Sequence, residues 1–104
     1  MSAPSYLGIT DATILTSITD EISNSIYNGL VVIPKYITTI STLTITDNAK
    51  DNIFAIQIPN SVTSIDDNAF AGLSKLEDLE FENGIRLSNI GKEIFSGCAL
   101  LDEI

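Results

Sequence analysis

The feature of this sequence that most constrains its fold is a repeat with an offset of 25 positions. Apolar residues and a glycine of one stretch return in the next. The first set is Ile65, Phe70, Gly72, Leu73, Leu76 and Leu79, and its counterparts are Ile90, Phe95, Gly97, Cys98, Leu101 and Ile104. Repeats of this length are typical of solenoids, whose units contact their neighbours and present extended binding surfaces.

Three short segments, residues 31–33, 56–58 and 79–81, carry the alternation of a strand. In each segment the first and third side chains face one way and the middle side chain faces the other. Stacking the units predicts a short parallel sheet with two buried columns. The first column is Val31, Ile56, Leu79 and Ile104, and the second is Ile33, Ile58 and Phe81.

The connections between these segments contain turn residues. Pro34 and Pro59 end their strands because proline cannot donate to a ladder, and Asn83-Gly84 is a turn that inserts two residues into a 23-residue unit. Residues 67–71 and 92–96 each predict a short helical turn that ends at a left-handed glycine. Residues 41–52 lack the Phe and Gly of the unit and are expected to form an irregular exposed loop.

The first 29 residues differ from the rest and allow two interpretations. Ile14, Ile18, Ile22 and Ile26 lie four apart, which is helical spacing. Alternatively, the segment is a degenerate repeat in which Ile18 matches Ile90 and Ile22 matches Ile94. Either way residues 1–29 are an N-terminal capping segment, and residues 30–104 hold about three repeat units, the last incomplete.

The motif Ile-Pro-x-x-Val-x-x-Ile, followed by Ala-Phe-x-Gly and Leu-x-x-Leu, resembles the BspA-type leucine-rich repeat. It runs from Ile58 to Leu76, and a second copy with Ile-Gly and Gly-Cys pairs follows. The resemblance implies an α/β solenoid with short parallel strands on the concave side and short helical turns or loops on the convex side. It also implies adhesion or protein binding at the surface of bacteria, protists or some viruses, without shared catalytic residues.

Composition excludes several function classes. The net charge of −9 argues against nucleic acid and anionic membrane surfaces. Without histidine, a Ser-His-Asp triad and a His-ligated zinc site are excluded. The single cysteine, Cys98, occupies an apolar repeat position and is expected to be a buried structural thiol. Asp66-Asp67-Asn68 does not fit a calcium loop and is interpreted as a turn, so no metal or cofactor is expected.

A strip of carboxylates is the candidate partner-binding site. If Leu79 and Phe81 point inward, Glu80 points out on the concave face beside other acidic residues. The strip comprises Glu77, Asp78, Glu80, Glu82, Asp102 and Glu103. Its functional interpretation is a contact for a basic protein surface. The alternative is a solvated face that discourages edge-to-edge aggregation.

These observations predict a non-catalytic protein-interaction or adhesion module. A structural subunit of a virion or surface layer is the alternative, because the repeat stops at Ile104 and leaves an apolar layer that a copy or a neighbouring subunit would cover. A hydrolase built on carboxylates is a third, weaker candidate. The N-terminus lacks the basic and apolar regions of a signal peptide, and no segment has the length of a membrane span.

Overall fold

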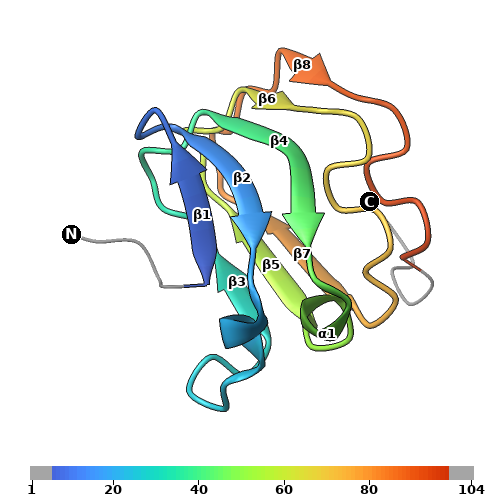
Figure 1. The fold of residues 1–104 in the computed structure, drawn as a ribbon. Helices are drawn as coiled ribbons and strands as arrows, with labels where there is room; N and C mark the ends of the chain where they lie inside the picture. Colours follow the sequence, from blue (N-terminus) through green and yellow to red (C-terminus); the bar gives the residue numbers. More distant parts are fainter. Residues whose placement is uncertain (1–5, 99–104) are drawn as a thin grey trace.

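The computed structural model describes residues 6–98, which form two sheets enclosing one apolar core (Figure 1). The five-stranded sheet has the order β1-β2-β4-β6-β8, and the three-stranded sheet has the order β3-β5-β7. The first sheet consists of Leu7–Thr10 (β1), Ile14–Ile18 (β2), Thr39–Ile45 (β4), Ser64–Ile65 (β6) and Asn89–Ile90 (β8). The second consists of Leu30–Val32 (β3), Ala55–Ile58 (β5) and Asp78–Phe81 (β7). Asp20–Ser23 (η1) and Asp47–Lys50 (α1) are short helices.

The three-stranded sheet confirms the three predicted strands and their parallel pairing. Val31 is in register with Ile56, and Ile56 with Leu79, as the first column requires. The second column is only partly correct, because Ile33 and Ile58 are buried whereas Phe81 is 37 % exposed. The register steps from β3 to β5 by 25 residues and from β5 to β7 by 23, which agrees with a two-residue insertion at Asn83-Gly84. The predicted fourth strand at Ile104 lies outside the described residues.

The five-stranded sheet shows that the repeated unit reaches into the N-terminal segment. Leu15 pairs with Ile40, Ile40 with Ile65, and Ile65 with Ile90, each 25 positions along. The helix proposed for residues 10–28 is therefore wrong, because residues 14–18 form a strand in this ladder. The alternative alignment of Ile18 with Ile90 is also wrong in register by three positions, since Leu15 occupies that column.

A column of hydroxyl residues links the units just before these strands. The backbone N–H of Thr38 donates to the carbonyl of Thr13 at 2.9 Å, that of Thr63 to Thr38 at 2.9 Å, and that of Ser88 to Thr63 at 2.8 Å. The Thr63 and Ser88 hydroxyls donate to the same carbonyls. Each residue lies 25 positions after the previous one, so one geometry repeats along the stack.

The turns after β6 and β8 are hydrogen-bonded turns, and the predicted helical turns are wrong in that respect. Successive turns bond to one another, because the N–H groups of Phe70 and Gly72 donate to carbonyls one unit later, at 3.0 and 2.7 Å. Gly72 and Gly97 do adopt the left-handed conformation, with φ of +86° and +80°. Phe70 is fully buried, as expected, and its ring stacks on that of half-buried Phe95 at 5.7 Å.

Residues 41–52 are more ordered than the sequence suggested. Most of the first half belongs to β4, and α1 follows, so the prediction of an irregular loop is wrong. The Thr46 hydroxyl accepts a hydrogen bond from the N–H of Ala49 at 3.2 Å, which is the geometry of a helix N-cap. Ile45 and Ala49 are buried and take the place of the missing Phe.

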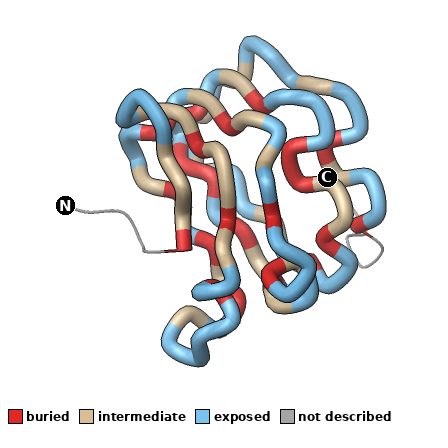
Figure 2. Tube along the Cα trace, in the orientation of Figure 1, coloured by how far each residue is buried: buried red, intermediate tan, exposed pale blue. Residues whose placement is uncertain are grey.

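Buried positions follow the inner faces of both sheets and alternate with exposed ones along the chain (Figure 2). No charged or polar residue is among the buried residues of the described part of the chain. Burial decreases toward the last strand of the larger sheet: Ile40 and Ile65 are 0 % and 2 % exposed, whereas Ile90 is 64 % exposed. Within residues 6–98, no helix has the length and apolar character to cross a membrane.

Tyr6 completes the edge of the smaller sheet. Its hydroxyl accepts a hydrogen bond from the Val32 N–H at 3.0 Å and donates one to the Leu30 carbonyl at 3.3 Å. A residue on a neighbouring parallel strand would bond to the same pair of groups. The ring is buried and packs edge-to-face on Tyr27 at 4.7 Å. A side chain thus substitutes for one residue of a missing strand beside β3.

Candidate functional site

The outer face of the three-stranded sheet carries side chains that change in character from strand to strand. One row across the sheet is Leu30, Ala55 and Asp78, and the next is Val32, Gln57 and Glu80. These residues alternate along their strands with the buried core residues, so they point away from the core. Both rows are aliphatic on β3 and acidic on β7. The face therefore has an apolar side and an anionic side.

A groove of about 730 Å³ lies where these strands end. Its apolar lining includes Val32, Phe81 and the two prolines that follow β3 and β5. Val32 and Phe81 are 41 % and 37 % exposed, so a partner that covered them would remove apolar surface from water. Gln57 and Glu80 supply polar groups in the same groove.

An ion pair crosses the end of this groove. The Nζ of Lys35 lies 2.7 Å from the Glu82 Oε2, and the Glu82 Oε1 accepts a hydrogen bond from the Asn60 N–H at 2.8 Å. The bonds from Lys35 and from the Asn60 backbone hold the pKa of Glu82 below its usual value. Because Lys35 follows β3 and Asn60 follows β5, the single carboxylate connects three successive units.

The structure divides the acidic strip predicted from the sequence. Asp78 and Glu80 lie on the outer face of β7 and are exposed, and Glu77 is exposed just before that strand. Glu82 is engaged with Lys35 and Asn60, which the sequence did not indicate. The positions of Asp102 and Glu103 lie outside the described residues.

Because the folded-state pKa of Glu82 is lowered, its contribution to stability is present above its usual pKa of 4.5 and is lost as the pH falls. We expect urea midpoints measured between pH 7 and pH 3 to fall more for the wild type than for Glu82→Gln. The difference should shrink in high salt, because Lys35 is exposed. Glu80→Gln is the control, since it leaves the pair intact. Parallel pH profiles for wild type and Glu82→Gln would contradict this role.

Sequence reasoning missed Val32, Gln57 and Lys35 as members of this face. The signal for the first two was present, because each is the outward middle residue of a predicted strand. Attention went to the carboxylates alone, and so the apolar half of the surface was not recognised. Lys35 lies 47 residues from Glu82, and nothing in their local sequence links them.

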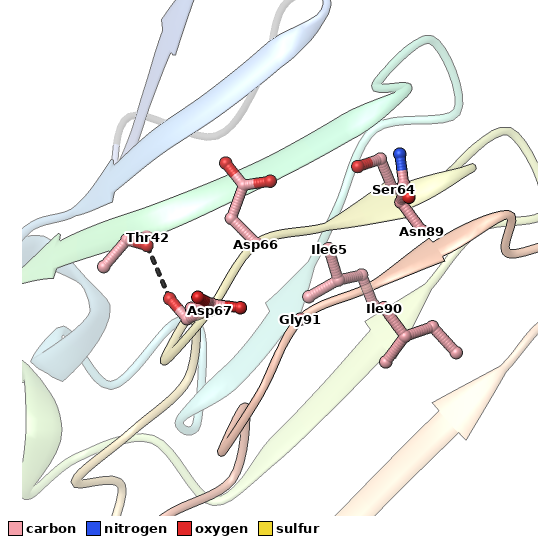
Figure 3. Close-up of a pocket in the computed structure, with 8 residues that line it drawn as sticks. All are labelled: Thr42, Ser64, Ile65, Asp66, Asp67, Asn89, Ile90 and Gly91. Carbon is pink, nitrogen blue, oxygen red and sulfur yellow. Dashed lines mark hydrogen bonds between the residues drawn. The ribbon is translucent and has the colours of Figure 1, made fainter.

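A second, polar groove of about 430 Å³ lies over β6 and β8 (Figure 3). Ser64 and Asn89 lie side by side there, and their strands pair in register. The Thr42 hydroxyl donates to the carbonyl of Asp67, while the Asp67 Oδ1 accepts a hydrogen bond from the Lys92 N–H at 2.7 Å. Asp67 thus joins neighbouring units, which agrees with its interpretation as a turn residue.

Gly91 fits this close spacing between units. A Cβ placed on Gly91 would lie 2.3 Å from the Asp67 backbone nitrogen, which is far too short for a nonbonded contact. The Ile-Gly pair therefore has a packing role in this chain, because only glycine lets β8 approach the preceding unit so closely.

The described residues hold few groups suited to chemistry. No cluster of three or more cysteine, aspartate and glutamate residues within 6–98 is placed to hold a metal ion. Cys98 is buried as expected, and its thiol donates to the Phe70 carbonyl at 3.3 Å. Burial raises the pKa of the Cys98 thiol, which disfavours the nucleophilic thiolate.

Parallel strands that pair at intervals of 23 to 25 residues, with turns bonded from unit to unit, define a repeat protein. A family model described as the BspA type leucine rich repeat region matches residues 6–104 in six copies. The chain belongs to this family, whose repeats generally mediate protein interaction and adhesion. The match includes most of the segment 1–29. Comparison with curated proteins and with solved structures gave no significant match.

Proposed function

We propose that the chain is a non-catalytic protein-interaction module, a short leucine-rich-repeat solenoid that binds a partner protein on the outer face of β3, β5 and β7. The observation that carries this proposal is the solvent-facing row Val32, Gln57 and Glu80 beside the groove at the strand ends. An exposed apolar surface with a polar rim is a common mark of a protein-binding site. Membership in a family of interaction repeats supports the same function.

The charge of the chain narrows the class of partner. With 14 acidic and 5 basic residues, it repels phosphate backbones and anionic lipid. A basic protein surface is attracted to the same charges. We therefore place the partner among proteins with a positively charged contact region, and adhesion to such a surface is one form this activity takes.

A random-peptide display selection on the immobilised chain tests the location of the site. The double variant Val32→Glu, Glu80→Lys changes both halves of the proposed face, and Asp66→Lys, Asn89→Lys changes exposed residues at the polar groove. We expect selected peptides to lose about tenfold or more in affinity for the first variant, as for a change at a binding hot spot.

The second variant should retain the selected peptides, and circular dichroism should show that both variants are folded. If the selected peptides bind both variants equally well, or lose affinity only for the variant at the polar groove, the proposed face is not the binding site.

A further inference from the structure

The order of side chains across the outer face specifies the chemistry of the segment that it binds. From β3 to β7 the two registered rows run from Leu30 to Asp78 and from Val32 to Glu80. The apolar and anionic ends of each row thus lie two strands apart, which corresponds to about 10 Å at the usual spacing of 4.7–4.9 Å between strands. A complementary ligand must offer an apolar group and a cation at a matching separation.

The carboxylate of Glu80 is free to pair with such a cation. Lys35 and Glu82 form the only ion pair among residues 6–98, and so Lys35 is already committed at the end of the groove. Glu80 lies on β7 with Asp78, and both are exposed. The local field on this side of the face is therefore negative and unneutralised by any described side chain.

We propose that this face binds an extended partner segment that crosses the three strands, with an aliphatic side chain over Val32 and an arginine or lysine two residues away at Glu80. This inference rests on the proposed function. In an extended segment, residues i and i+2 face the same side and lie roughly 7 Å apart. The flexible stem of a long basic side chain spans the remaining distance to the carboxylate.

A second copy of the chain does not fit this requirement. The chain carries a net charge of −9, so two acidic faces would repel each other. The cation must come from a partner of different composition. An aliphatic-x-Arg or aliphatic-x-Lys segment satisfies both halves of the surface, whereas a purely basic or purely apolar segment satisfies only one.

The test is a nuclear magnetic resonance titration of the full chain with the peptide acetyl-Gly-Ser-Val-Ser-Arg-Ser-Gly-amide. We expect amide shifts to be largest around Val32, Gln57 and Glu80 and to decrease in high salt. Replacing the peptide valine by serine, or its arginine by glutamate, should each weaken binding about fivefold or more, as at a hot spot.

A charge exchange gives the decisive comparison. The variant Glu80→Arg should lose the arginine peptide and gain the glutamate peptide, whereas the matched variant Asp66→Arg, which changes the net charge equally, should behave as wild type. The inference is overturned if the serine peptide binds as tightly as the valine peptide, if Asp66→Arg has the effect of Glu80→Arg, or if the shifts occur elsewhere.

The two proposals can fail separately. If the displayed peptides require the face but none of the designed peptides discriminates, the binding face stands and the order of aliphatic and basic groups is wrong. If the displayed peptides do not require the face, the proposed function fails together with this inference.

Discussion

Replacing Phe70 with alanine should lower the free energy of unfolding by about 3–5 kcal/mol, because truncating a buried phenylalanine loses its transfer energy and leaves a cavity. Phe70 is fully buried and its ring stacks on Phe95. A domain of this size has a total stability of about 5–15 kcal/mol. Phe70→Ala is therefore expected to remove a large part of the stability, and urea unfolding followed by circular dichroism measures the loss.

Phe81→Ala is the matched control for this prediction. Phe81 is the same residue type, but it is 37 % exposed and lies on the last described strand of the smaller sheet. Its truncation removes less buried surface and leaves no enclosed cavity, so the loss of stability should be clearly smaller. Equal losses for the two variants would show that the core is not centred on the turn that carries Phe70.

The strands of the smaller sheet could be predicted because alternation and spacing agree at each of them. Val31, Ile56 and Leu79 recur at one position of the unit, and a side chain repeated in register packs on its own copies. Phe81 departed from the expected burial for a physical reason. A column is covered on both sides only in its interior, and β7 is the last described strand of its sheet.

The N-terminal segment shows how a true local pattern can mislead. The four-residue spacing of isoleucines that begins at Ile14 suits a helix, yet Leu15 lies 25 positions before Ile40 and pairs with it. The neighbouring Thr13, Thr38 and Thr63 have the same spacing and bond in sequence. The larger offset prevailed because pairing with β4 satisfies the backbone groups of β2 and buries Leu15 and Ile18 together.

Residues 41–52 carried a helix signal that was overlooked. Thr46 precedes Asp47, and a threonine before an acidic first turn favours a helix start. The absence of the usual Phe and Gly directed attention away from it. The unit keeps its core by placing Ile45 and Ala49 inward.

The candidate site depended on contacts that local sequence does not encode. The outward positions of Gln57 and Glu80 followed from strand alternation, and so half of the face could be predicted. The ion pair of Lys35 with Glu82 depends on how two strand ends converge after stacking. Tyr6 was equally hidden, because a hydroxyl that replaces a strand residue leaves no periodic trace.

Tyr6→Phe should lower the free energy of unfolding by about 1–3 kcal/mol, the usual cost of leaving buried polar groups without partners. The substitution keeps the ring and its contact with Tyr27, and it removes only the hydroxyl that bonds to Leu30 and Val32. The β3 edge would lose the group that stands in for a neighbouring strand. Urea unfolding at pH 7 measures the change, and Tyr36→Phe, at an exposed tyrosine, should have little effect.

The same hydroxyl predicts a dependence on alkaline pH. Burial raises the pKa of Tyr6 above its usual value of 10.0, against the opposing effect of the hydrogen bond from Val32. A group whose pKa is raised on folding contributes stability below its unfolded pKa and loses it as the pH rises further. The wild type should therefore lose stability above pH 10 more steeply than Tyr6→Phe, so that the gap between them narrows. Tyr36→Phe should follow the wild type, and a constant gap across this range would contradict the assignment of Tyr6 as the edge cap.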